Sequence, residues 1–144
     1  MAPQNYANHR RFVPLFHGVL MPVLFLTAIG SLVNLALSVG DHERIYGASL
    51  IVVLSLAMCM LCVFARVFAL KAQDRAIRAE ENLRHFAITG KLLDPRLGVL
   101  QVVALRFASD GEFPTLARRA AEEGMQPDAI KRAVKSWKAD TYRA

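Results

Sequence analysis

The chain has 144 residues, of which 54% are hydrophobic, and it carries a formal net charge of +6. This length is enough for one ordinary domain. The mean hydropathy of +0.30 is high for a water-soluble protein. Two cysteines are too few for a disulfide framework, which excludes a small disulfide-stapled domain.

Two long stretches, residues 12–40 and residues 45–65, contain no Asp, Glu, Lys or Arg. A helix needs ~20 apolar residues to cross the hydrocarbon of a bilayer, and both stretches are long enough. The first is too long for the central region of a cleaved signal peptide, so it predicts a retained span. We therefore predict an interfacial segment at 1–15, a membrane helix at 16–39, an external loop at 40–45 and a second membrane helix at 46–66.

Basic residues lie outside the two predicted spans. Arg10 and Arg11 precede the first span, and Arg66 and Lys71 follow the second, whereas the loop at 40–45 carries two acids and one base. Lys and Arg concentrate on the cytoplasmic side of membranes, so both termini are predicted to be cytoplasmic. The same four residues are expected to face anionic lipid headgroups of the inner leaflet.

Small and polar side chains mark the faces through which the two spans are expected to pack. The predicted packing residues are Thr27, Gly30, Asn34, Ser55, Cys59 and Cys62. Asn34 is interpreted as a partner in a helix-to-helix hydrogen bond, with a substrate or ion ligand as the alternative. Cys59 and Cys62 are interpreted as packing residues rather than a redox pair, because a redox pair needs a helix N-terminus and solvent.

The second span is predicted to continue beyond the membrane as one helix from about residue 45 to residue 89. After Arg66, no Pro or Gly interrupts it before Gly90, which is a suitable C-cap. Its extension at 67–90 forms a cytoplasmic stalk, supported by acid-before-base pairs such as Glu80 with Arg84.

A nearly heptad seam of mostly small residues follows the stalk. Its members are Ala65, Ala69, Ala72, Ala76, Ala79, Leu83 and Phe86. Alanine side chains are small, so an alanine seam lets another helix approach closely. They bury little apolar surface themselves, so the partner must supply the larger apolar side chains. That partner is either a second copy or the chain's own tail, whose largest apolar group is Trp137. A stalk that merely faces solvent is the alternative.

The tail at 91–144 is predicted to form three short helices, too small for a large core of their own. Asp94 and Pro95 suit the start of the first, Gly124 ends the second, and Pro127 opens the third.

The third tail helix is expected to bury one face that ends at Trp137 and to expose a basic face. The basic residues are Lys131, Arg132, Lys135 and Lys138. They are interpreted as facing acidic lipid headgroups or an acidic partner. A helix-turn-helix bound to DNA is the rival interpretation, and nucleic acid is the less favoured partner because no amide or aromatic readers accompany the basic residues.

No catalytic motif is present. The histidines lack zinc spacing, no Gly-rich phosphate loop exists, and no Ser or Cys lies on a nucleophile elbow. We therefore predict no catalytic, metal-binding or cofactor-binding residue and expect a protein that is not an enzyme. His9, His17 and His85 are expected near the inner surface, where interfacial hydrogen bonding is favoured over a metal or proton site.

Four blocks of the chain resemble a known family. They are NYANHRRFVPLFH at 5–17, QDRAIRAEENLR at 73–84, LRFASDGEFP at 105–114 and IKRAVKSWKAD at 130–140. Together they are similar to an uncharacterised bacterial family of short two-helix membrane proteins, a domain of unknown function. The resemblance implies a bacterial inner-membrane protein with two membrane helices and a cytoplasmic helical tail, and it implies no activity.

These patterns predict an all-α, multi-pass protein: a transmembrane hairpin, a cytoplasmic stalk and a three-helix tail. The favoured function is non-catalytic, as an assembly or accessory subunit, or a self-associating scaffold, that uses the stalk and tail to bind another copy or a larger membrane complex. The alternatives are a membrane-tethered DNA-binding regulator and a small oligomeric membrane protein that handles ions or solutes.

Overall fold

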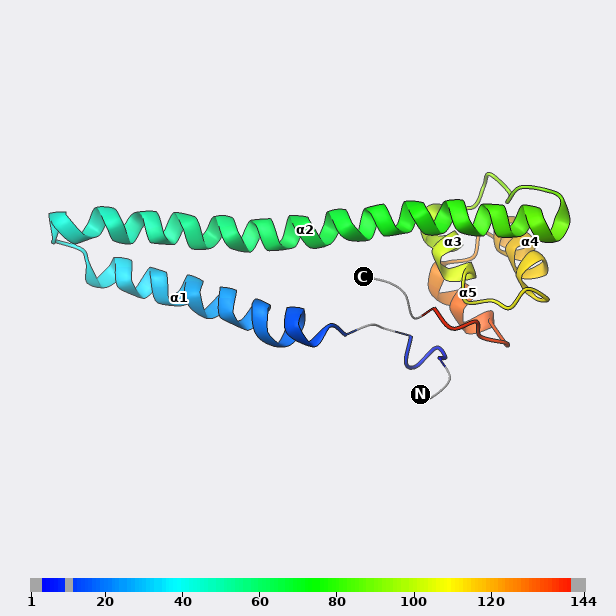
Figure 1. The fold of residues 1–144 in the computed structure, drawn as a ribbon, viewed down its shortest axis with the longest axis horizontal. Helices are drawn as coiled ribbons and strands as arrows, with labels where there is room; N and C mark the ends of the chain where they lie inside the picture. The colour runs from blue at the N-terminus through cyan, green and yellow to red at the C-terminus, as the bar shows by residue number, and fades with distance from the viewer. Residues whose placement is uncertain (1–3, 10–11, 141–144) are drawn as a thin grey trace. The chain divides into compact units, whose positions relative to one another are not determined.

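The computed structural model describes residues 4–9 and 12–140 (Figure 1). The helices are η1 (Leu15–Leu20), α1 (Met21–Leu37), α2 (His42–Thr89), α3 (Val99–Leu105), α4 (Phe113–Glu123) and α5 (Pro127–Ala133). The described residues form no strand beyond an isolated bridge between Ala108 and Trp137, which confirms the all-α prediction. The chain divides into two compact units, one between residues 12 and 68 and one made of residues 4–9 and 69–140.

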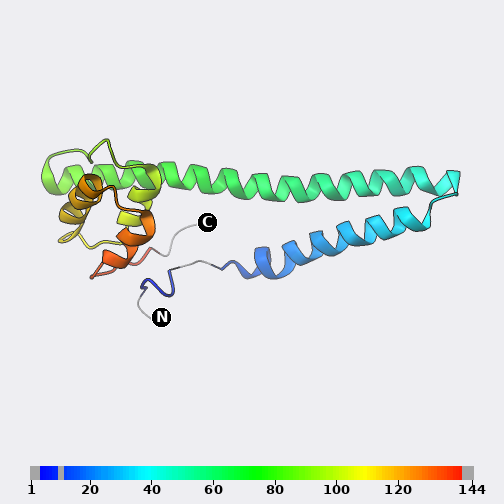
Figure 2. The same ribbon diagram turned by 180° about the vertical axis from the view of Figure 1, so that it is seen from behind.

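The first unit is a hairpin in which the first part of α2 runs back alongside α1 (Figure 2). The helix begins after Pro14 as the π-helical turn η1 and takes α geometry from Met21. Pro22 lies in the first turn of α1 and has no N–H to donate to the preceding turn.

The turn between α1 and α2 is shorter than the predicted loop at 40–45. Gly40 adopts a φ of 94°, which favours glycine. One oxygen of Asp41 then accepts hydrogen bonds from the backbone N–H groups of Glu43 (3.1 Å) and Arg44 (3.2 Å). Because Asp41 satisfies these free donors, α2 begins at His42 rather than after residue 45.

Figure 1 shows α2 as one uninterrupted helix of 48 residues, about 72 Å at 1.5 Å per residue. It ends at Thr89, where Gly90 adopts a φ of 71° and donates its N–H to the carbonyl of Phe86 at 2.8 Å. A left-handed glycine is a common helix stop because other residues meet a steric penalty there. The predicted continuous helix and its C-cap are confirmed.

Two helices are long and apolar enough to cross a membrane. The segment Leu15–Leu37 has a mean hydropathy of 2.1, and α2 contains a window of 2.7. Only 6% and 17% of these windows are buried. A core helix of a soluble protein buries most of its apolar side chains, so these helices present an unusually large apolar surface.

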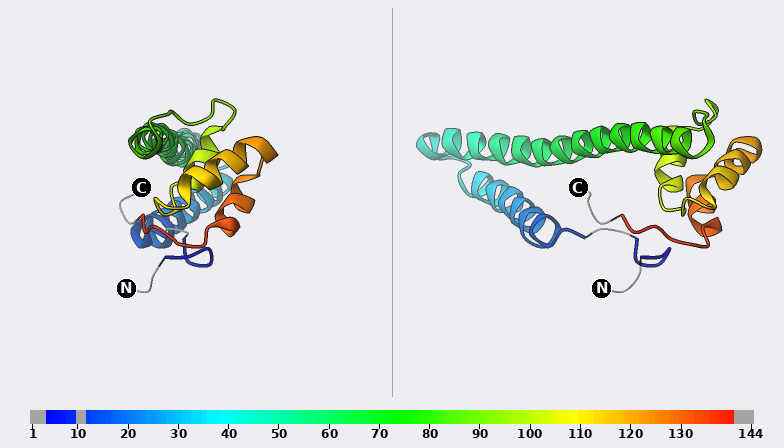
Figure 3. Two further views of the ribbon diagram at one scale, coloured as in Figure 1. Left: turned by 90° about the vertical axis from the view of Figure 1, so that its right-hand side faces the viewer. Right: turned by 45° about the vertical axis from the view of Figure 1, so that its right-hand side comes forward.

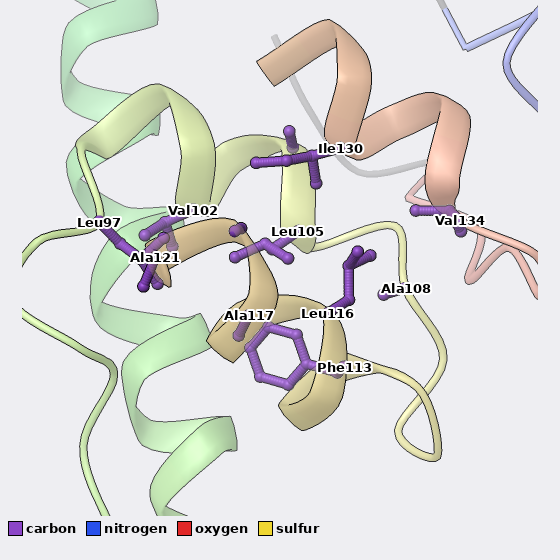
Figure 4. Close-up of a cluster of buried hydrophobic side chains, with 12 residues drawn as sticks. Leu97, Val102, Leu105, Ala108, Phe113, Leu116, Ala117, Ala121, Ile130 and Val134 are labelled. Carbon is purple, nitrogen blue, oxygen red and sulfur yellow. The ribbon is translucent and has the colours of Figure 1, made fainter. Parts of the chain in front are cut away.

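The second unit has its own hydrophobic core, drawn in Figure 4. It is built by α3, α4, α5 and their connections, which lie to one side of α2 (Figure 3). The buried residues are Leu97, Val102, Ala104, Leu105, Ala108, Phe113, Leu116, Ala117, Ala120, Ala121, Ile130 and Val134. Five of these twelve are alanines, which let the three short helices approach closely.

The predicted start of the first tail helix is wrong. Helix α3 begins after Gly98, whose N–H donates to the Gln101 side chain at 2.7 Å. Asp94 instead closes a turn, because its carboxylate accepts the backbone N–H of Arg96 at 2.9 Å and binds the guanidinium of the same residue.

The predicted length of the last helix is also wrong. Helix α5 ends at Ala133, and an extended segment follows. In that segment Lys138 donates its N–H to the carbonyl of Phe107 (2.8 Å), and Ser136 accepts the N–H of Ser109 (3.0 Å). These hydrogen bonds replace those of another helical turn, so Trp137 belongs to a bridge and not to a helix face.

Candidate interaction surfaces of the long helix

The hairpin is joined by small polar side chains. The hydroxyls of Ser31 and Ser55 lie 3.0 Å apart, and both residues are buried. Further along α2, the Cys59 thiol donates to the carbonyl of Leu24 at 3.9 Å. The predicted second-helix residues Ser55, Cys59 and Cys62 therefore face α1, and the Cys62 thiol points to the Met21 sulfur at 3.9 Å.

The contacting face of α1 is shifted by one residue from the expected stripe. Thr27 and Gly30 lie on the exposed side of α1, and a Cβ built on Gly30 would meet nothing within 4 Å. Ser31 occupies the contact that Gly30 was expected to make. Asn34 is half-buried, and its backbone carbonyl accepts the hydroxyl of Ser38 at 2.8 Å.

Aromatic and basic groups gather where the hairpin helices reach its open end. The Arg66 guanidinium lies over the Phe16 ring at 5.5 Å, and His17 stacks on Phe12 at 4.9 Å. The Nδ1 atom of His17 is held by the backbone of Val13. The predicted headgroup-facing residues Arg10 and Arg11 lie outside the described residues.

The second half of α2 offers one face to the tail. Ile77 and Glu81 are buried there. The Arg84 guanidinium joins Glu81 at 2.8 Å, Asp110 at 2.6 Å and the carbonyl of Ala108 at 2.7 Å, and it covers the Phe113 ring at 4.5 Å. The guanidinium beside Asp110 also lowers the pKa of that carboxyl. Arg84 therefore pairs with Glu81, not with Glu80 as predicted.

The seam lies on a different face. Leu83 follows Ile77 by six residues, which places the two side chains ~120° apart around a helix with 3.6 residues per turn. Every seam residue is exposed, including Leu83 (68%) and Phe86 (50%). The expectation that the chain's own tail covers the seam is wrong, because Trp137 packs on Phe107 at 4.9 Å instead.

The N-terminal segment 4–9 contacts the basic residues of α5. Tyr6 donates its hydroxyl to Asp128 at 2.7 Å, and its ring lies under the Arg132 guanidinium at 5.2 Å. The hydrogen bond from Tyr6 lowers the pKa of Asp128, and Arg132 adds to the effect. Lys131 meets the His9 ring at 3.4 Å.

The four predicted basic residues of the tail do not share one helix face. Lys135 and Lys138 are exposed in the extended segment after α5, whereas Lys131 and Arg132 lie on α5 and contact His9 and Tyr6. A recognition helix needs its basic side chains free along one face, so this arrangement does not support the helix-turn-helix interpretation. Lys71 is exposed on α2.

The histidines do not belong to a cluster of metal-binding side chains in the described part of the chain. Among residues 4–9 and 12–140, no group of three or more His, Cys, Asp or Glu side chains could hold a metal ion. His85 is committed to structure: its Nδ1 atom bonds the carbonyl of Lys91 at 2.7 Å, and its ring meets the edge of Phe113.

The packing roles of three residues were not predicted from the sequence. Ser31 could not be distinguished from the small residues on neighbouring faces of α1. Arg84 was assigned to a surface pair, although a buried acid at position 81 was an equally near partner. The burial of Ile77 could have been predicted, since it is the only Ile in the sequence between Leu70 and Phe86.

Comparison with known proteins gives one result. No curated protein and no solved structure matches the chain. Residues 1–144 match the family described as "Family of unknown function (DUF6526)". Since the match spans the whole sequence, the chain belongs to the DUF6526 family of unknown function.

Proposed function

We propose that this protein is a non-catalytic membrane scaffold that self-associates through the seam of α2, with both termini in the cytoplasm. The observation that carries this proposal is the exposure of the whole seam on a face of α2 that the docked tail does not cover. The tail cannot cover the seam without giving up the contacts of Arg84, so a second copy is the partner we propose.

The membrane location is supported by the exposed apolar side chains of α1 and of the first half of α2. Such surface is costly in water at roughly 25 cal/mol per Å² and is matched by lipid tails. The basic flanks of the two spans then lie on the cytoplasmic side of a bacterial inner membrane, facing anionic headgroups.

The seam has the spacing of a coiled coil. Ala69, Ala76 and Leu83 fall at the a positions, and the d positions alternate with them from Ala65 to Phe86. Alanines allow a close approach of the two helices. Leu83 and Phe86 supply larger apolar groups at the end near the tail.

Charges beside the seam favour a parallel pair. Arg75 falls at a g position and Glu80 at the following e position, and in parallel coiled coils a g residue faces the e residue five positions later on the partner helix. Both side chains are exposed, and within the described residues neither forms an ion pair. A parallel dimer therefore creates two symmetric Arg75–Glu80 pairs.

Native mass measurement in mild detergent tests this proposal. We expect a dimer for the full chain and a monomer for Ala76→Glu, because the substitution places a carboxylate in the dry seam. The matched control is Ala129→Glu, since Ala129 is exposed on α5 and away from the seam. A wild-type monomer, or a monomer bound to an unrelated protein, contradicts self-association.

Charge exchange tests the orientation. Arg75→Glu should weaken the dimer, and the double variant Arg75→Glu/Glu80→Arg should restore it, because the parallel pairing is rebuilt with reversed signs. Exposed pairs are worth ~0.2–1 kcal/mol each, so a severalfold change in the dissociation constant is expected. Failure of the double variant to recover would speak against the parallel arrangement.

A further inference from the structure

A cavity of about 430 Å³ lies between the end of α2, the loop that follows it and the first half of α4. All of its lining residues belong to the second unit. Its volume is in the range of small-molecule sites, ~300–1,000 Å³. The proposed self-association does not use it, because the seam is on another face of α2.

Polar side chains line two sides of this cavity. His85, Thr89 and Lys91 come from the end of α2 and its loop, and Thr115 and Arg118 come from α4. The His85 ring is fixed by the Lys91 carbonyl at 2.7 Å and by the edge of Phe113 at 5.7 Å. These contacts fix the position of His85 in the cavity wall and hold Lys91 next to it.

The charge of the cavity is positive. Asp94 is its one lining carboxylate, and Arg96 binds that group with nitrogen–oxygen distances of 2.7 and 3.0 Å. The same hydrogen bonds lower the pKa of Asp94 to about 2, so it stays ionised and offset by Arg96. Lys91 and Arg118 form no ion pair within the described residues.

We propose that this cavity binds the phosphate monoester of a small organic group. A phosphate monoester carries ~1.5–2 negative charges near pH 7 and three acceptor oxygens. Its charge therefore matches the two uncompensated cations Lys91 and Arg118, and its oxygens match the hydroxyl of Thr115. The organic group lies against the apolar wall formed by Leu93, Pro114 and Ala117.

Calorimetric titration of the full chain with phenyl phosphate in mild detergent tests the site. We expect saturable binding at one site per chain, weakened about tenfold by Lys91→Ala or Arg118→Ala, since each loses one charge-assisted contact worth ~1.5 kcal/mol. The matched control is Arg119→Ala, because Arg119 is next in sequence, pairs with Glu123 at 3.4 Å and does not line the cavity.

Two further results decide the ligand class. Benzoate has a similar ring and one negative charge, so it should bind at least tenfold more weakly than phenyl phosphate. Equal affinity for benzoate would overturn the assignment to phosphate. Absence of saturable phenyl phosphate binding, or equal losses in Arg118→Ala and Arg119→Ala, would overturn the site itself.

The phosphate has two possible sources, a soluble molecule or the headgroup of phosphatidic acid. The titration is therefore repeated in nanodiscs that contain phosphatidic acid or an equal charge of phosphatidylglycerol. Weaker phenyl phosphate binding only with phosphatidic acid identifies the lipid as the source. Unchanged binding in both nanodiscs identifies a soluble ligand.

Discussion

The two units of this chain bury their side chains in opposite ways. The second unit encloses a twelve-residue core in which Phe113 is fully buried. The hairpin buries mainly small residues, such as Ser31 and Ala48, and leaves large apolar groups such as Phe25 exposed. The difference teaches that the tail buries its apolar side chains within its own core, whereas the hairpin leaves an apolar surface that is costly to expose to water.

The largest effect is expected from deleting a core aromatic group. Phe113→Ala should cost about 3–5 kcal/mol because it removes a fully buried ring and leaves a cavity. Phe25→Ala, in the hairpin, is the matched control, since the ring is 66% exposed. Thermal unfolding followed by circular dichroism in detergent compares the two; similar losses would contradict the contrast between the units.

A smaller loss is expected when the tail loses its anchor on α2. Arg84→Ala removes hydrogen bonds to Glu81, Asp110 and Ala108, and it leaves the buried Glu81 carboxylate unpaired. We expect a loss of about 2–3 kcal/mol, since hydrogen bonds to charged groups are the strong ones. Hydrogen exchange should accelerate in residues 108–113, and unchanged exchange there would show that other contacts hold the tail.

In the hairpin, substitutions at the neighbouring residues Ser31 and Gly30 should differ in their effect on stability. Ser31→Ala removes the hydroxyl contact with Ser55 and should weaken the helix pair by about 0.6 kcal/mol, the average for membrane hydrogen bonds. Gly30→Ala is the control, because the added methyl group meets open space. Thermal stability in detergent measures both variants. A larger loss for Gly30→Ala would place the helix contact on the other face.

The smallest effect is expected when the pH is lowered, and it concerns the contact between the N-terminal segment 4–9 and α5. The pKa of Asp128 is lowered by the Tyr6 hydroxyl and by Arg132, so the folded protein holds this carboxylate ionised more readily than the unfolded chain. The contact is therefore fully present above the ordinary carboxyl pKa and is lost as pH falls through the lowered value. Exchange at residues 4–9 should rise in acid, and Tyr6→Phe should remove most of that dependence.

Sequence patterns predicted the elements that strong local signals delimit. Gly90 and Gly124 end helices as expected, since both adopt positive φ, and Pro127 opens α5. The continuation of α2 beyond the apolar span also followed from the absence of Pro and Gly between Arg66 and Gly90.

Elements fixed by distant contacts were not predictable. The start of α3 depends on Gln101, which accepts the Gly98 N–H and also donates to the carbonyl of Met125. The end of α5 depends on backbone bonds to residues 107 and 109. The face that α1 turns toward α2 depends on which small residue contacts Ser55. Several small residues are neighbours in the sequence of α1, so its faces cannot be distinguished by their side chains.

Cysteine cross-linking of the seam tests the central claim most directly. In a background with Cys59→Ala and Cys62→Ala, a cysteine at Ala76 should form a disulfide between two copies, because a positions meet in a parallel pair. A cysteine at Arg78, also exposed on α2 but away from the seam, should not. The proposal predicts efficient cross-linking at residue 76 alone; no cross-link there, or equal cross-linking at both positions, would contradict it.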